Sequence, residues 1–132
     1  MSINAADGHV ILGQVTASGE TATINVQASG SITEDSDPTA DLDAGGLITL
    51  SAGSGLGTSS NSLGIAGNSL VHATCTDGSI YLHGLGALTV QEATTNGGTA
   101  EILSDGTLTA TTINAQLANL QASSGGIAAT AI

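Results

Sequence analysis

The chain has 132 residues with no lysine and no arginine, against eleven aspartates and glutamates and three histidines, so its formal net charge at pH 7 is −11. Without a fixed cation it cannot neutralise phosphate groups or bind an anionic membrane surface by charge, which argues against nucleic-acid, nucleotide and lipid-surface functions. We therefore expect no nucleic-acid partner, and no membrane insertion either, since no apolar run approaches the length of a membrane span.

The composition predicts a folded chain with an unusual core. Charged residues make up only 8% and hydrophobic residues 40%, unlike a typical disordered chain. With no Trp, no Phe and one Tyr, burial has to come from Ile, Leu, Val and Ala, which suit thin repeated layers. Cys75 has no second cysteine to pair with and is expected to be a small buried strand residue.

Short segments that alternate with period two, each bounded by Gly, Ser, Asn or Asp, predict strands at residues 22–26, 47–50, 79–82, 87–90 and 107–110. The segment 111–123 leaves an alternative open. Its Ile113, Leu117 and Leu120 have helical spacing and lie among helix-favouring Ala and Gln residues, so a short amphipathic helix is possible there.

An aliphatic residue shortly after a glycine recurs along the chain with a mean spacing of about 20 residues, at Val10, Ile32, Ile48, Leu70, Leu88, Leu108 and Ile127. Such a repeat of short strands and tight turns predicts an all-β fold, a single-stranded parallel β-helix (β-solenoid) of about 6–7 rungs that spans residues 1–132 as one segment. The residues expected in its core stack are Val10, Ile24, Ile32, Ile48, Leu70, Ile80, Leu88, Ile102, Leu108 and Ile127.

The two ends of such a column are open sheet edges, which template further pairing unless they are capped. Neither terminus carries an obvious charged or proline-rich cap. We therefore expect self-association end to end, or continuation into neighbouring repeats of the same chain.

Four short segments resemble the repeats of filamentous-haemagglutinin-type and related giant bacterial surface proteins: Gly30–Thr33, Asp77–Leu82, Ser104–Ala110 and Gln121–Ile127. In that family, similar segments repeat along very long right-handed parallel β-helices. The resemblance covers roughly residues 8–33 and 46–128, and the family's N-terminal secretion domain has no counterpart here. It implies the right-handed shaft of an extracellular fibre or adhesin on the bacterial cell surface, with no catalytic residues to carry over.

The acidic segment 34–46 holds five of the eleven acids and the single proline, and it is expected to bulge between rungs as a loop. Asp35, Asp37, Asp41 and Asp43 could converge on calcium, which takes six to eight oxygens in irregular geometry. The order of the acids does not match an EF-hand loop. The alternative is a solvated loop without a metal.

The sequence gives little support for a transition-metal site or for catalysis. His9, His72 and His83 lack neighbouring cysteines or acids at recognised metal spacing, which favours ordinary strand or surface histidines over a zinc or copper site. A pair such as Asp35 and Asp37 could in principle cleave a glycoside, but a sugar cleft normally uses aromatic and cationic side chains. We expect no enzymatic activity.

The leading hypothesis is a structural extracellular protein, a β-solenoid shaft segment that belongs to a giant adhesin or polymerises end to end into a filament. The alternative is a carbohydrate- or surface-binding adhesion module that holds glycans or a host surface in polar loops. A weaker alternative is an ice-binding solenoid, suggested by Thr-x-Thr pairs at Thr21/Thr23, Thr74/Thr76, Thr107/Thr109 and Thr109/Thr111.

Overall fold

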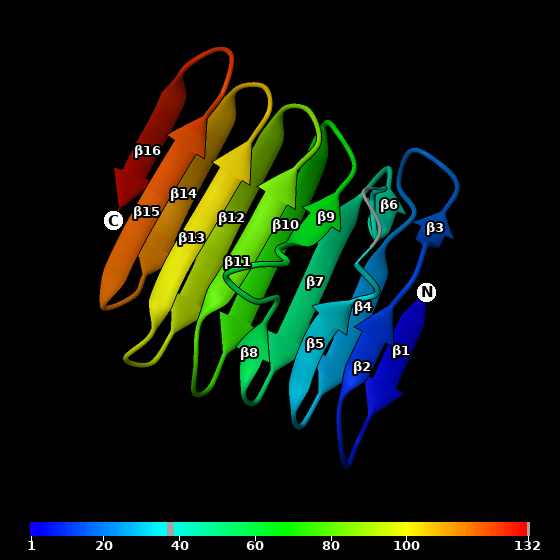
Figure 1. The fold of residues 1–132 in the computed structure, drawn as a ribbon. Coiled ribbons are helices and arrows are strands. Elements are labelled where there is room, and N and C mark those ends of the chain that lie inside the picture. Colours follow the sequence, from blue (N-terminus) through cyan, green and yellow to red (C-terminus); the bar gives the residue numbers. More distant parts are fainter. Residues whose placement is uncertain (37–38, 132) are drawn as a thin grey trace.

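A computed structural model describes residues 1–36 and 39–131 as a β-solenoid of about six turns (Figure 1). Sixteen strands and no helix occur in these residues. Every pairing between the strands is parallel, and each pairing joins a strand to one about a turn away in sequence. The all-β parallel fold expected from the 20-residue repeat is thereby confirmed. No helix long and apolar enough to cross a membrane is found in the described part of the chain.

One face of the coil, sheet A, holds seven strands, one from each turn and one from the start of a further turn. In spatial order they are β1 (Ser2–Ala5), β4 (Ile24–Ala28), β7 (Leu47–Ala52), β10 (Ser69–Cys75), β12 (Leu88–Thr95), β14 (Leu108–Asn114) and β16 (Ile127–Ala131).

The other face, sheet B, has nine strands because it is split in the first three turns. Its first ladder runs through β2 (Val10–Leu12), β5 (Ser31–Glu34), β8 (Gly55–Leu56), β11 (Ile80–Gly84), β13 (Thr99–Ser104) and β15 (Leu117–Ala122). A second, shorter ladder runs through β3 (Val15–Ala17), β6 (Leu42–Ala44) and β9 (Leu63–Ile65), and β9 joins the end of β11.

The split divides the coil into two kinds of turn. Paired residues differ by 23 or 24 positions in the first turns, as Ser2 with Asn25 and Ile24 with Ile48. They differ by 20 and 19 positions later, as Leu88 with Leu108 and Leu108 with Ile127. The extra residues of the early turns form loops between the two halves of sheet B.

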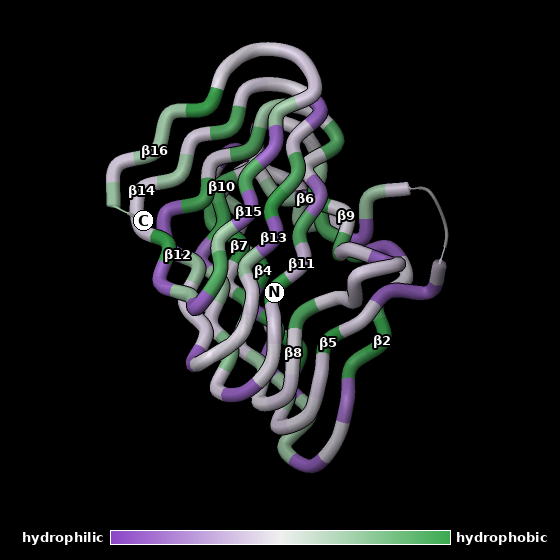
Figure 2. The backbone as a smooth tube through the Cα atoms, turned by 60° about the vertical axis from the view of Figure 1, so that its left-hand side comes forward, coloured by the Kyte–Doolittle hydropathy of each residue, from purple (hydrophilic) through white to green (hydrophobic). Residues whose placement is uncertain are grey.

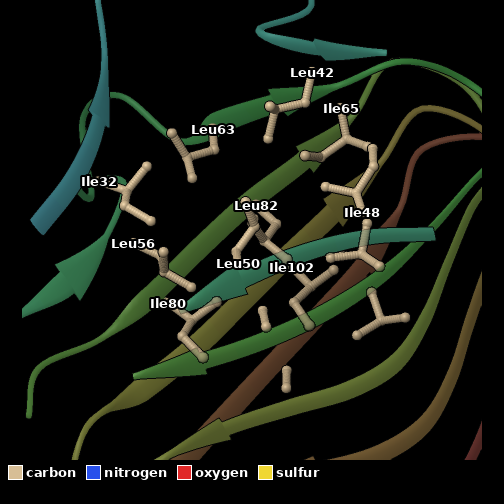
Figure 3. Packing of buried hydrophobic residues seen from close by; sticks show 14 of the residues in the cluster. Ile32, Leu42, Ile48, Leu50, Leu56, Leu63, Ile65, Ile80, Leu82 and Ile102 are labelled. Atoms are coloured by element: carbon tan, nitrogen blue, oxygen red, sulfur yellow. The ribbon is translucent and has the colours of Figure 1, made fainter. Parts of the chain in front are cut away.

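The core lies between the two sheets and consists of aliphatic side chains stacked in columns (Figure 3). Alternate residues of each long strand face inward, as in β10 and β11, because successive side chains of a strand point to opposite faces. The expected core residues that are at most 1% exposed are Ile24, Ile32, Ile48, Ile80, Leu88, Ile102 and Leu108.

Three of the expected core residues are placed differently. Val10 is only half-buried because it lies in the first turn, and Ile127 is 47% exposed because it lies in the last strand. Leu70 lies on the outward side of β10, between the buried Ser69 and Val71. The equivalence of the seven repeat positions is also wrong, since Val10 and Ile32 belong to sheet B and the other five to sheet A.

The segment 111–123 contains no helix. It forms the end of β14, a tight turn at residues 115–116 and β15 (Figure 2). Backbone pairing with β12 and β13 in the turn before outweighs the helical spacing of its aliphatic residues. Ile113 is buried, whereas Leu117 is 60% exposed, which a helix with one apolar face would not give.

Candidate functional site

The most distinctive part of the surface is the stack of loops that splits sheet B. These lateral loops are residues 13–14, 35–41 and 57–62, of which 37 and 38 lie outside the described residues. They are tied to one another by backbone hydrogen bonds: Asp35 N donates to Leu12 O at 3.0 Å, and Gly57 N donates to Ile32 O at 2.8 Å. The loops therefore continue the ladder of the coil outward from its side.

Asp41 lies at the centre of this stack and is 1% exposed. Its backbone joins three turns, because Val15 N donates to Asp41 O at 2.8 Å and Asp41 N donates to Gly64 O at 2.9 Å. Its carboxylate Oδ2 also accepts the Gly64 N–H at 2.6 Å. A Cβ at Gly64 would lie 3.1 Å from that oxygen and 3.0 Å from Thr39 O, so any larger residue would crowd both atoms.

The carboxylate of Asp41 lies close to two others. One oxygen from each of Glu34, Asp35 and Asp41 lies within 4.8 Å of the others. Glu34 Oε2 accepts the Ser36 N–H at 2.6 Å, while Glu34 Oε1 is buried and accepts no hydrogen bond from the described residues. The chain has no Lys or Arg to balance this negative charge. Like charges at this separation disfavour one another, and a cation would relieve the repulsion.

The predicted calcium ligands are only partly brought together. Asp35 and Asp41 lie in the cluster, and Glu34, which the sequence reasoning passed over, is the third member. Asp43 is exposed on the outer side of β6 and does not belong to the cluster, and Asp37 lies outside the described residues. The acidic segment 34–46 also contains a strand, β6, so its loop ends at residue 41. The period-two alternation of residues 42–44 was the signal for that strand.

This donor set suits a hard cation. Carboxylate oxygens are ligands that calcium prefers, and the shortfall from six to eight ligands can be met by backbone oxygens and water. Asp41 also has a structural role that needs no metal, since its carboxylate and backbone both bind Gly64. The cluster could therefore hold one divalent cation or serve only to tie the loops together.

The three histidines lie apart, each next to a residue in a neighbouring turn. His83 Nε2 is 2.8 Å from Asp105 Oδ1, and His72 Nε2 is 3.3 Å from Glu92 Oε2; both contacts are ion pairs when the imidazole is protonated. His9 Nδ1 accepts the Ser31 N–H at 2.8 Å. The single group of three or more metal-ligating side chains found in the described residues contains no histidine.

A polar notch lies beside the lateral loops. It has a volume of about 330 Å³. It is lined by Glu34 and Ser36, the loop residues 59–62, and His83 of β11 with Glu101 and Leu103 of β13. Its lining offers hydroxyl, amide, carboxylate and imidazole groups and includes no Phe, Tyr or Trp.

The Thr-x-Thr pairs do not form a continuous face. Thr109 pairs with Thr89 in the turn before and with Ala128 in the turn after, and Thr74 pairs with Ser51 and Thr94. None of the four predicted pairs stacks on another in the described ladders.

The ends of the coil leave core side chains incompletely covered. The hydrophobic residues that pack against the core but are only partly buried all come from the first turn or from residue 115 onward: Ile3, Ala5, Val10, Val15, Ala17, Ala115, Ala118, Leu120 and Ala122. Four of the five exposed large hydrophobic residues lie there as well: Met1, Ile11, Leu117 and Ile127.

In comparisons with known proteins, no family model, no curated protein and no solved structure matches this chain. The fold thus rests on the strand ladders, and the filamentous-haemagglutinin-type resemblance stays a prediction.

Proposed function

We propose that this chain is a structural, non-catalytic module, a β-solenoid shaft segment of an extracellular bacterial fibre or adhesin that is extended by end-to-end stacking. The observation that carries the proposal is the partial exposure of inward-facing side chains in the first and last turns. Each end offers unpaired backbone groups around an uncovered apolar centre, and a further turn of the same coil would cover both.

The C-terminal edge also lacks the devices that normally keep sheets from pairing. Natural edge strands carry lysines, prolines or inward-pointing charges. Residues 106–132, which contain β14, β15 and β16, include no charged side chain and no proline. The sides of the coil are different, because outward positions carry polar and charged side chains, as the Thr, Gln and Glu residues of β12 do. The chain is therefore protected along its sides and open at its end.

The stacking can be tested by sedimentation velocity and negative-stain electron microscopy of the purified chain over a range of concentrations. We expect rods that lengthen with concentration. Leu120→Lys places a charge at the open end of the core and should keep the chain monomeric. Thr89→Lys, which adds the same charge to the side of the coil, should leave the rods intact. Monodisperse particles at every concentration would contradict end-to-end stacking.

The extracellular part of the proposal has its own test. Antibodies raised against the purified chain should label intact cells of the source organism from the outside, along fibres. Labelling that appears only after permeabilisation would contradict an extracellular location.

A second candidate is an adhesion module that binds a glycan in the notch beside the lateral loops. The notch favours this reading because Asn61, His83 and Glu101 present hydrogen-bonding groups of the kinds that recognise sugar hydroxyls. A glycan array probed with the wild-type chain and with Asn61→Ala tests it. Binding that Asn61→Ala weakens at least tenfold would support this candidate, and an array without any binding would contradict it.

A further inference from the structure

The short turns that carry the chain from sheet A to sheet B lie along one edge of the coil (Figure 1). The turn between β12 and β13 consists of Asn96, Gly97 and Gly98, and it holds the single Asn-Gly step of the chain. Each of the other six asparagines precedes a residue that has a side chain. A glycine has no Cβ beside its backbone nitrogen, so an asparagine side chain can approach that nitrogen without hindrance.

The middle of this turn is open to solvent and unconstrained. Asn96 and Gly97 are both exposed. Gly97 has a φ of +80°, and a Cβ built on it would have no heavy atom within 4 Å. In the described part of the chain, no hydrogen bond involves the Asn96 side-chain amide or the Gly97 N–H. Both groups can therefore change their orientation without breaking a contact.

The two sides of the same turn are fixed by neighbouring turns. Thr95 is 4% exposed, and its hydroxyl donates to Gly78 O. Gly98 O accepts the Gln116 N–H at 2.9 Å, and a Cβ on Gly98 would overlap Gly78 O. The freedom of the turn is thus confined to Asn96 and Gly97.

We propose that Asn96 is a site of spontaneous covalent modification, in which the Gly97 nitrogen attacks the Asn96 side-chain amide and the residue ends as a carboxylate. A bond forms between the Gly97 nitrogen and Asn96 Cγ. The bond between Cγ and Nδ2 breaks, and ammonia leaves with the proton of the Gly97 nitrogen. The product is a five-membered succinimide. The inference does not depend on the proposed end-to-end stacking.

Water then opens the succinimide at one of its two carbonyl carbons. Cleavage between Cγ and the Gly97 nitrogen gives aspartate with an ordinary main chain. Cleavage between the main-chain carbonyl carbon and that nitrogen gives isoaspartate, whose main chain is one carbon atom longer. Both routes consume one water and release one ammonia, and neither needs an oxidant or a reductant.

The two products have different consequences for the coil. The aspartate side chain is exposed in the turn, so the fold should tolerate it. It adds a negative charge near Asp77 of the preceding corner turn, in a chain without Lys or Arg. Isoaspartate instead lengthens a segment that Thr95 and Gly98 hold at both ends. It should therefore loosen this corner and lower the melting temperature.

The other asparagines serve as internal controls. Asn61 is exposed, but its Nδ2 donates to Ser36 Oγ at 3.0 Å. Asn68 is exposed, but the residue after it, Ser69, is 2% exposed and begins β10. The remaining four lie within strands: Asn4, Asn25, Asn114 and Asn119. We expect Asn96 to react first.

The test is mass spectrometry of the purified chain after incubation for weeks at mildly alkaline pH. Trypsin has no site in this chain, but cleavage after Glu92 and Glu101 releases the peptide 93–101, in which Asn96 is the only asparagine and no aspartate occurs. This peptide should gain the mass that accompanies replacement of an amide –NH₂ by –OH, and it should elute as two products. The gain should be at least tenfold faster than in peptides that contain Asn61 or Asn68.

Two references separate the turn's geometry from the dipeptide's chemistry. A synthetic peptide of residues 93–101 gives the unconstrained rate, and the folded chain should react within about tenfold of it. A folded rate further below the peptide's would show that the turn protects Asn96 and would overturn the proposal. Equal rates at Asn96, Asn61 and Asn68 would overturn the choice of site.

Two variants test the consequence for stability. Asn96→Gln keeps the amide but should show neither the mass gain nor a change in melting temperature after the same incubation. Asn96→Asp supplies the ordinary product and should melt like the fresh wild type. The incubated wild type should melt below both variants. Unchanged melting of an incubated wild type that contains isoaspartate would overturn the loosening of this corner.

Discussion

At the corner of the core where the chain passes from sheet B to sheet A, the large side chain comes from sheet B in one turn and from sheet A in the next. A Cβ added to Gly84 would lie 2.7 Å from Leu88 Cβ and 3.2 Å from Leu88 Cδ2, so the leucine occupies the space that a larger residue 84 would need. One turn earlier, the same two columns hold Ile65 and Ser69, with the large residue on the other sheet. Each turn thus places one large side chain at this corner.

This exchange predicts strong coupling between residues 84 and 88. Gly84→Ile alone overpacks the corner and should cost about 3 kcal/mol of unfolding free energy. Leu88→Ala alone removes a side chain that is 1% exposed and should cost about 2–5 kcal/mol. The double variant restores the order found at Ile65 and Ser69, and it should lie within about 1.5 kcal/mol of the wild type. The coupling energy is then about 3 kcal/mol or more.

The assay is a double-mutant cycle from urea unfolding followed by far-UV circular dichroism. Gly84→Ile combined with Val26→Ala, a buried position two turns away in sheet A, is the control and should be additive. Losses that simply add in the double variant at residues 84 and 88 would refute the idea that one corner space is shared.

Four further measurements follow from the same structure. Leu108→Asp buries an unpaired charge and should cost at least about 3 kcal/mol by urea unfolding, whereas the outward neighbour Thr109→Asp should cost less than about 1 kcal/mol. Ser69→Ala removes a buried hydroxyl that has no partner in the described residues, and it should raise the unfolding free energy by about 1 kcal/mol. Burial raises the pKa of the Cys75 thiol, so iodoacetamide at pH 8 should modify the folded chain at least tenfold more slowly than the urea-unfolded chain. Because the unfolded thiol ionises more readily, this residue should also lower stability as the pH rises above the ordinary thiol pKa. If the cluster of Glu34, Asp35 and Asp41 holds calcium, the melting temperature should be higher in millimolar calcium than in chelator, and Asp35→Asn should reduce this difference. Identical wild-type melting curves in calcium and in chelator would contradict a calcium site.

The repeat length could be read from the sequence because glycine-bounded aliphatic strands recur locally. The assignment of positions to faces could not, because both corners of a turn use the same local signal. Gly30 before Ile32 opens a strand of sheet B, and Gly46 before Ile48 opens a strand of sheet A. A pattern of this kind gives the length of a turn but not which of its two faces a strand belongs to.

The lateral loops limited the prediction of the site in the same way. Asp41 is buried because turns on either side of it hold its backbone, and the contacts with Val15 and Gly64 span more than 20 residues. Asp43, two residues later, points outward from β6. The density of acids marked the segment correctly, but only the register between turns decides which carboxylates meet.

The axial repeat of the assembled chain, measured by electron microscopy of its filaments, tests the central claim most directly. Six or seven levels per copy at about 4.8 Å each predict a subunit repeat of roughly 29–34 Å along a rod of constant width. A repeat far outside that range would contradict the stacking of whole coils end to end. The absence of any filament would contradict the end-to-end assembly on which the account rests.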